Sequence, residues 1–209
     1  MPAPDIARDP DPVVAVVLDR THARFFQVRG RRVVEVAGLV SSALEEERRH
    51  YAAIAHRLLE LKRECGARGL LVAGPGPVPR AFRRSLPEGL AARVIGTARL
   101  NPLEVTAPAV GRAASRARQG YLRSVETDLL ATLREGVGTG WAVNGAAATT
   151  MALQRRRVRV LLVAEGVVAG SATGAVMEAR RQGVPVCVVH GAGAAHVAEL
   201  GALLRQREG

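Results

Sequence analysis

The chain has 209 residues, enough for one large domain or two of about 100 residues, and its 48% hydrophobic and 23% charged residues are typical of a soluble globular protein. No apolar run reaches the length of a membrane span, and two cysteines are too few for a disulfide framework. The 30 Lys and Arg residues against 19 Asp and Glu residues give a net charge of +11, which makes nucleic acid the leading partner class.

Arginine supplies nearly all of the positive charge, because Lys62 is the only lysine. A planar guanidinium group recognises phosphate through paired hydrogen bonds, which an ammonium group cannot do. A GC-rich genome would also replace lysine by arginine, but that alternative does not explain the net charge. The polar, proline-rich residues 1–12 are unlike a signal peptide, so we expect a disordered tail on a cytoplasmic protein.

After the tail, the sequence predicts three strands joined by short turns, which is typical of an antiparallel meander. The strand segments are Val13–Leu18, Ala23–Val28 and Arg32–Val36. A long helix follows and runs to about Glu64, because its apolar residues recur at intervals of three and four. Ser41 or Ser42 is the expected N-cap of this helix.

Three further segments complete the first domain. Gly69–Ala73 is a fourth strand, Pro79–Leu86 a short basic helix and Val94–Leu100 a fifth strand. The order βββαβαβ is typical of an RNase H-like α/β domain, which we place at residues 13–108.

A second αβ unit is expected beyond a linker. Residues 106–136 are rich in Arg, Ala and Leu and predict a helix. Its residues 109–123 would be the linker, and its residues from 124 onward would belong to a second domain at 124–209. In that domain Ala146–Gln154 contains good helix formers, and Val158–Val163 is a nearly continuous β-branched run that suits a buried strand.

Six short motifs carry a resemblance to a known family through their order and spacing. They are Val17-Leu18-Asp19, Ala23–Phe26, Arg48-Arg49-His50-Tyr51, Leu70–Gly74, Gly183–His190 and Glu199–Arg205. The chain resembles the archaeo-eukaryotic peptide-chain release factors and Pelota, in a bacterial branch of that family. The resemblance covers the family's middle and C-terminal domains, and we expect no counterpart of the N-terminal domain that decodes stop codons. It implies that the second domain is an αβα sandwich of the kink-turn ribosomal-protein fold.

The predicted helix Ala146–Gln154 indicates whether the second domain resembles the RNA-binding branch or the release-factor branch of its superfamily. In the RNA-binding members of the kink-turn superfamily, this helix opens with Gly-Ala-Asn-Glu-x-x-Lys, and the Asn, Glu and Lys grip the RNA. Gly145 and Ala146 fit, but the gripping positions fall on Ala147, Ala148 and Met151, which offer no polar group. The resemblance therefore favours the release-factor branch, in which this domain mainly holds a protein partner.

The resemblance also implies where catalysis would reside. Release factors place a Gly-Gly-Gln loop between the third strand and the long helix, where it positions water for hydrolysis of peptidyl-tRNA. The matching loop here contains Gly38, Ser41 and Ser42 but no glutamine. We therefore predict no catalytic residue, as in Pelota, which also lacks the loop and works by binding.

The sequence lacks the residues that dinucleotide binding, metal binding or nuclease activity would need. Gly191–His196 is similar to a dinucleotide fingerprint without its third glycine, and a strand-to-helix turn explains it as well. Cys187, His190 and His196 lack the second pair of ligands that would complete a metal site. Asp19 is a lone carboxylate, whereas metal-dependent nucleases need several. We predict neither a metal nor a cofactor.

Basic clusters on successive elements are the remaining candidate site, although any one of them could be an ordinary solvated face. The predicted RNA-binding residues are Arg48, Arg49, His50, Arg80, Arg83, Arg84, Arg155, Arg156 and Arg157. The linker adds Arg112, Arg116 and Arg118.

Together these observations predict a ribosome-binding translation factor of the release-factor or Pelota type, acting in rescue, recycling or hibernation without hydrolysing peptidyl-tRNA. The expected partners are the ribosome and ribosomal RNA, with tRNA or a translational GTPase as further candidates, and no membrane. Two alternatives stay open: a peptidyl-tRNA hydrolase or release factor with a degenerate loop, and an RNA-binding module outside translation.

Overall fold

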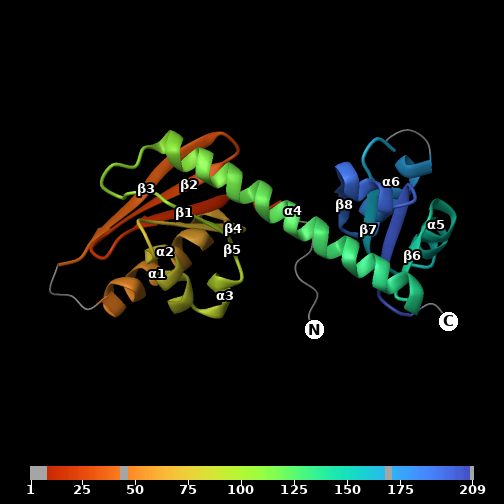
Figure 1. Cartoon of the computed structure of the whole chain (residues 1–209), viewed down its shortest axis with the longest axis horizontal. Helices are drawn as coiled ribbons and strands as arrows, with labels where there is room; N and C mark the ends of the chain where they lie inside the picture. Colours follow the sequence, from red (N-terminus) through yellow and green to blue (C-terminus); the bar gives the residue numbers. More distant parts are fainter. Residues whose placement is uncertain (1–8, 43–46, 168–170, 208–209) are drawn as a thin grey trace. The chain divides into compact units, whose positions relative to one another are not determined.

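The computed structural model describes residues 9–42, 47–167 and 171–207. The chain forms two compact units, Asp9–Tyr121 and Leu122–Gly209, and each has its own sheet (Figure 1). The predicted mixed α/β class is confirmed. None of the helices in the described ranges is both long and apolar enough to cross a membrane.

The first unit is built on a five-stranded sheet with the order β3-β2-β1-β4-β5. Its elements are β1 (Val13–Leu18), β2 (His22–Arg29), β3 (Arg32–Val40), α1 (Glu47–Cys65), β4 (Gly69–Ala73), α2 (Val78–Ser85), α3 (Glu88–Ala91) and β5 (Val94–Ala98). β1 pairs antiparallel with β2 and parallel with β4, and β5 continues the parallel edge. This is the predicted RNase H-like arrangement with one additional short helix.

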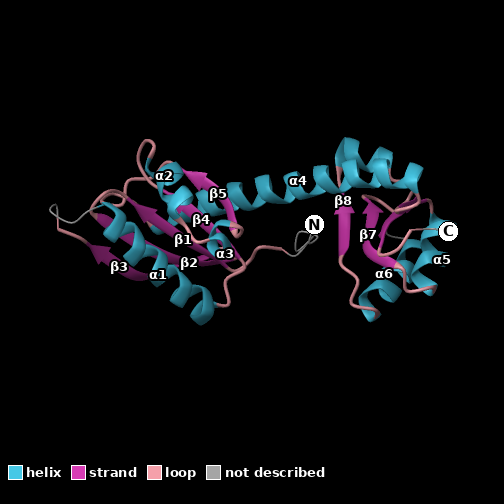
Figure 2. Cartoon of the chain, turned by 90° about the horizontal axis from the view of Figure 1, so that it is seen from below, coloured by secondary structure: helices cyan, strands magenta, loops and turns pink. Residues whose placement is uncertain are grey.

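Strand β1 is buried along its whole length because both faces of the sheet are covered. Val14, Val16 and Leu18 pack with residues of α1, α2 and α3, whereas Val13 and Val17 pack with the first part of α4 (Ala107–Thr139). Figure 2 shows α1 and α2 on the face of the sheet turned toward the viewer.

Asp19 closes the turn from β1 to β2. Its carboxylate accepts hydrogen bonds from the backbone N–H groups of Thr21 and His22, both at 2.7 Å. Burial alone would raise the pKa of Asp19, but these hydrogen bonds outweigh it and hold the pKa below its usual value. The lone carboxylate noted in the sequence is therefore accounted for by the turn.

The predicted tail is partly held in place. Residues 1–8 lie outside the described residues. Of the rest, the Asp11 carboxylate accepts from the backbone N–H of Gly30 at 3.2 Å, and the carbonyl of Pro12 accepts from Arg68 at 2.9 Å. Residues 9–12 thus pack as part of the first unit.

The second unit is built on a four-stranded sheet with the order β6-β9-β7-β8. Beyond the last part of α4, its elements are β6 (Ala142–Asn144), α5 (Ala146–Gln154), β7 (Val158–Ala164), α6 (Ser171–Arg181), β8 (Val186–Val189), η1 (Gly191–His196) and β9 (Leu200–Leu204). α5 and α6 contribute to one core cluster, whereas Leu129 and Leu133 of α4 contribute to the other. The predicted αβα sandwich is confirmed.

The segment with the dinucleotide-like spacing differs from a strand-to-helix turn. Gly191–His196 forms a short 3-10 helix, and the next element is strand β9 rather than a helix. A helix N-terminus, which a dinucleotide site needs for its pyrophosphate, does not follow this segment.

Candidate nucleic-acid interface

At the start of α1, two of the three predicted RNA-binding residues are exposed to solvent. Arg48 and Arg49 are exposed. The prediction was wrong for His50. This residue is only 1% exposed and lies on the helix face that also carries buried Tyr51 and Ile54. Its ring lies against Ser41, with 2.6 Å between Oγ and Nδ1. A side chain buried in this way supports the core and does not present itself to RNA.

The loop that corresponds to the Gly-Gly-Gln position begins later than the sequence suggested. Strand β3 continues to Val40, which pairs with His22, and Gly38 pairs with Arg24 inside the sheet. Gly38 is therefore a strand residue. The described part of α1 begins at Glu47, so the N-cap role of Ser41 or Ser42 stays a prediction, and the Ser41 hydroxyl lies beside the His50 ring. Ser42 is exposed, and the rest of the loop, residues 43–46, lies outside the described part of the chain.

Helix α2 carries a compact basic face. Phe82 is fully buried in the core of the first unit, whereas Arg80, Arg83 and Arg84 are exposed. Residues three and four positions apart are neighbours on a helix, so Arg80 lies close to the two others and their like charges repel. An anion bound there would relieve this repulsion.

A groove of about 580 Å³ lies beside α2, lined by Arg80 and Arg99 together with residues that follow β4 and end β5. It is therefore at the carboxyl ends of parallel strands, where open α/β sheets bind their ligands. Gly74 permits this layout, since a Cβ at that position would lie 2.3 Å from the carbonyl oxygen of Leu18. Two arginines in such a groove suit phosphate.

The third predicted cluster ends α5. Arg155 and Arg156 are exposed, and Arg157 is partly buried. Arg156 has a φ of +55°, in the left-handed region. The N–H of Arg156 donates to Leu153 and that of Arg157 to Ala152, at 2.9 and 3.0 Å, which is a Schellman motif with arginine where glycine is usual. A groove of about 460 Å³ next to it is lined by Arg156, Glu178, Arg181, Gln182 and Arg205.

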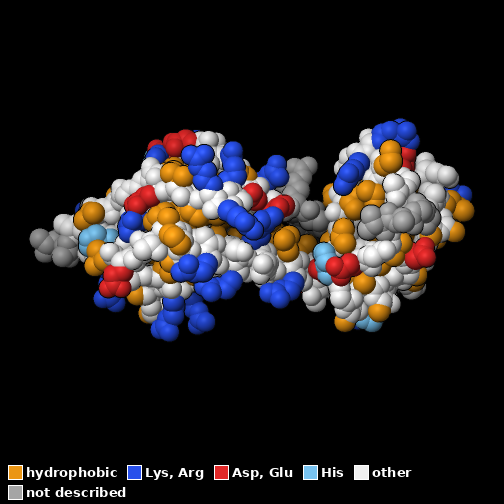
Figure 3. Space-filling view, turned by 90° about the horizontal axis from the view of Figure 1, so that it is seen from above, with side chains coloured by type: hydrophobic (Ala, Val, Ile, Leu, Met, Phe, Trp, Pro, Cys, Tyr) orange, Lys and Arg blue, Asp and Glu red, His pale blue; other side chains and the backbone are white. Residues whose placement is uncertain are grey.

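Within the described ranges, none of the eight predicted arginines forms an ion pair with a carboxylate. Arg24 shows the opposite case, because it pairs with Glu35 at 2.7 Å and donates to two backbone carbonyls. In the linker, Arg118 pairs with Asp9, whereas Arg112 and Arg116 are exposed. The face of the first unit seen in Figure 3 accordingly carries many more basic than acidic side chains.

The remaining candidate positions offer little chemistry. Ala147 and Met151 are exposed on α5, and Ala148 packs against the core, so the gripping positions present only apolar groups. Burial, with the nearby Glu126 carboxylate adding to it, raises the pKa of the Cys187 thiol to about 11. A thiol that stays protonated at neutral pH is a poor nucleophile and a poor metal ligand.

No protein-family model and no curated protein matches the chain, whereas solved structures do. A model of ribosome-bound archaeal Pelota and ABCE1 matches over 94% of the chain and 62% of its own, with 20% identity and a TM-score of 0.65. A structure of Dom34 from S. cerevisiae, a translation termination-like factor involved in RNA quality control pathways and interacting with Hbs1, matches over 94% of this chain and 63% of its own, with 13% identity and a TM-score of 0.63.

A crystal structure of Archaeoglobus fulgidus Pelota matches over 95% of the chain and 65% of its own, with 19% identity and a TM-score of 0.50. At these identities the likeness shows a shared fold. The chain spans 62–65% of the length of the solved structures it matches.

Proposed function

We propose that this chain is a ribosome-binding translation factor of the Pelota and release-factor type, which acts in rescue, recycling or hibernation in the cytoplasm. The observation that carries the proposal is that one likeness, to ribosome-bound archaeal Pelota, extends over 94% of the chain and so includes both units. Either fold alone occurs with many functions. The succession of the two in one chain is a much narrower match.

The unpaired arginines support ribosomal RNA as the surface that is bound. Those of α2 and of the α5 end lie on separate units, beside grooves of about 580 and 460 Å³ that they help to line. Phosphate contacts of this kind provide most of the sequence-independent affinity for nucleic acid. A protein partner for the second unit, of the translational GTPase class, is part of the proposal, because Dom34 interacts with Hbs1.

We further propose that the chain does not hydrolyse peptidyl-tRNA. Hydrolysis needs a group that holds water within hydrogen-bond reach of the ester carbonyl. Gly38 is part of a strand, and the Ser41 hydroxyl lies against a buried histidine. The sequence from Ala43 to Glu46, which lies outside the described residues, includes no glutamine.

Cosedimentation of the purified protein with ribosomes tests the binding proposal. We expect the protein to pellet with ribosomes at low salt and to be released as salt rises, because counterions compete for the phosphates. Arg80→Glu, Arg83→Glu and Arg84→Glu together should abolish most of the pelleting. Arg31→Glu, Arg63→Glu and Arg68→Glu are the matched control, since these three exposed arginines lie outside the clusters. Absence of pelleting at low salt would show that the ribosome is not the partner.

A release assay tests the second proposal. Ribosomes loaded with peptidyl-tRNA should keep their peptide when the protein is in excess. Release well above the protein-free rate that is lost in the Ser41→Ala, Ser42→Ala variant would establish a hydrolase with a degenerate loop.

A further inference from the structure

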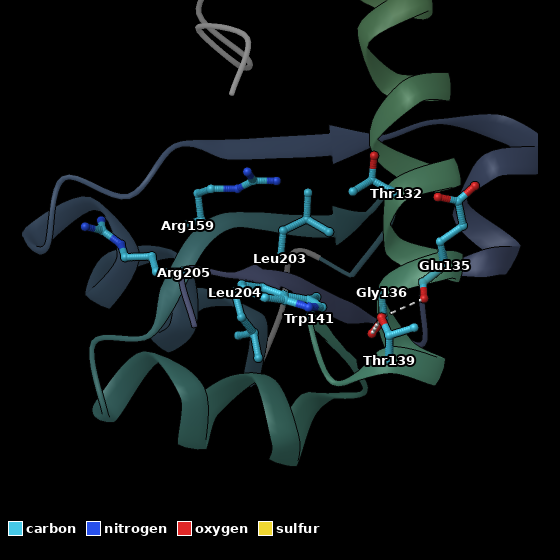
Figure 4. Close-up of a pocket in the computed structure, with 9 residues that line it drawn as sticks. All are labelled: Thr132, Glu135, Gly136, Thr139, Trp141, Arg159, Leu203, Leu204 and Arg205. Carbon is cyan, nitrogen blue, oxygen red and sulfur yellow. Dashed lines mark hydrogen bonds between the residues drawn. The ribbon is translucent and has the colours of Figure 1, made fainter. Parts of the chain in front are cut away.

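Trp141, the only tryptophan of the chain, lies in a groove of the second unit that sequence reasoning did not single out. The groove has a volume of about 450 Å³, and the indole is 50% exposed although it is the largest side chain present. Figure 4 shows Trp141 between Glu135 and Thr139 of α4 on one side and Arg159 and Arg205 on the other. A half-exposed indole in a groove that two arginines line suits a ligand with both a flat apolar part and negative charge.

The backbone of Trp141 is held by hydrogen bonds within the second unit. Its N–H donates to the carbonyl of Gly136 at 2.9 Å, and its carbonyl accepts from the N–H of Leu204 at 2.9 Å. Gly136 allows this approach, since a Cβ there would lie 2.7 Å from the Cβ of Ala142. The backbone that carries the indole is therefore anchored to both α4 and the sheet.

Arg159 reaches the groove through an irregularity in β7. Val158 pairs with Leu204 and Val160 with Leu203, so Arg159 is an extra residue that no residue of β9 opposes. Val158 belongs to the core cluster under α5 and α6, whereas Val160 belongs to the cluster under α4. The bulge thus turns Arg159 to the side of the sheet where α4 lies, as bulges do near functional sites. Its buried Nε finds no hydrogen-bond partner among the described residues.

Arg205 is held by the neighbouring strand. Its Nε donates to the carbonyl of Val158 at 3.0 Å and its backbone N–H to that of Arg157 at 2.8 Å. Arg205 lines this groove and also the groove that contains Arg156 and Arg181. The positive charge therefore continues from the indole toward the end of α5.

We propose that the Trp141 groove binds single-stranded RNA, with one base stacked on the indole and adjacent phosphates paired with Arg159 and Arg205. Any base can stack on an aromatic ring, and each such contact contributes about tenfold or more to affinity. Glu135 on the rim disfavours a run of acidic side chains but can accept a hydrogen bond from the amino group of a base. A duplex keeps its bases stacked internally and cannot fill the groove in this way. The site does not depend on the chain acting at the ribosome.

Tryptophan fluorescence reads this site directly, because no other tryptophan contributes. The purified chain is titrated with a single-stranded RNA of about ten nucleotides, with a duplex of the same sequence and with poly-glutamate. We expect saturable quenching by the single strand and little by the duplex. Quenching by poly-glutamate but not by the single strand would overturn the proposal and assign the groove to an acidic protein.

Variants separate stacking from charge, with the anisotropy of labelled RNA as the readout. Trp141→Ala should weaken binding of the single strand about tenfold, and Trp141→Phe should retain most of the affinity, which shows that the fold is intact. Arg159→Gln should also weaken binding. Arg123→Gln, an exposed arginine of α4 outside the groove, is the matched control and should bind as the unchanged chain does. Equal affinity of Trp141→Ala and the unchanged chain would refute the proposal.

Discussion

The two units present basic grooves of different composition. The groove beside α2 has Arg80 and Arg99 but only Gly, Pro, Ala and Thr besides, whereas the groove beside α4 adds an indole to its two arginines. Positive charge binds a phosphate backbone whether or not its bases are stacked and paired. An aromatic ring, in contrast, can stack only on a base that has left its own stack. If both grooves bind RNA as proposed, the first unit supplies affinity and the second distinguishes single strands from duplexes.

The largest expected effect concerns the charge of the first unit. Arg80→Gln, Arg83→Gln and Arg84→Gln together remove up to three phosphate contacts, each of which contributes about 0.7 to the slope of log K against log salt on single-stranded RNA. We expect the slope to fall by about 2, measured by anisotropy from low to moderate salt. An unchanged slope would show that α2 does not contact phosphate.

Trp141→Ala should leave that slope as it is, because a stacking contact releases no counterion. Its loss of affinity, about tenfold, should be the same at every salt concentration and absent for duplex RNA. A loss that grew with salt concentration or extended to the duplex would show that the two grooves do not differ as proposed.

The close approach of α4 to Trp141 gives a stability test confined to the second unit. Gly136→Ala places a Cβ against Ala142, and we expect it to lower the free energy of unfolding of this unit by about 1–3 kcal/mol. Gly138→Ala is the matched control, since nothing lies within 4 Å of a Cβ there, and it should be stabilising by about 0.5–1 kcal/mol. Denaturant unfolding followed by Trp141 fluorescence measures both.

Asp19→Asn is the corresponding test of the first unit. Because the pKa of Asp19 is lowered on folding, the ionised carboxylate stabilises the fold above the pKa of the unfolded chain, near 4, and that contribution is lost as the pH falls through the folded value. We expect a loss of about 1 kcal/mol at neutral pH that disappears in acid. A difference that did not change with pH would mean that the charge is not what stabilises the turn.

The smallest effect is a gain in stability. Arg156→Gly removes a side chain from a left-handed residue and should be stabilising by about 0.5–1 kcal/mol, while it lowers the salt slope of RNA binding by about 0.7. Arg155→Gly is the control, because its φ of −80° suits any residue and glycine there should be destabilising. If the glycine at position 156 changed neither quantity, arginine would have no function at that position.

Local sequence pattern predicted the elements whose pattern is continuous from one end to the other. The bounds of β1, β4 and α5 agree with the structure, because each is an apolar run or a run of helix formers with turn residues beside it. β6 was not predicted, since three residues are too few to show a pattern and the strand depends on pairing with β9. The extension of β3 likewise depends on β2, which holds Gly38 and Val40 in register.

The residues of the candidate sites also fall into those that the sequence could predict and those that it could not. The exposed arginines of α2 could be recognised because Phe82 fixes which side of the helix is buried. His50 was assigned to the surface because it follows two arginines, although its spacing of four residues from Ile54 places it on the buried face of α1. Trp141 had a signal in the sequence, as a lone tryptophan directly after Gly140 in a chain poor in aromatic residues. Arg159 had none, because a bulge is a property of two paired strands.

The bulge has a consequence for insertions and deletions. If Arg159 were deleted, Val158 and Val160 would be adjacent, and the alternation of faces from Val158 to Ala164 would become regular with each side chain in its present core cluster. The pairing of β7 with β9 would also keep its present partners. β7 is therefore a complete strand without Arg159, and the gain of a single codon within a regular strand is enough to add a guanidinium group to the groove.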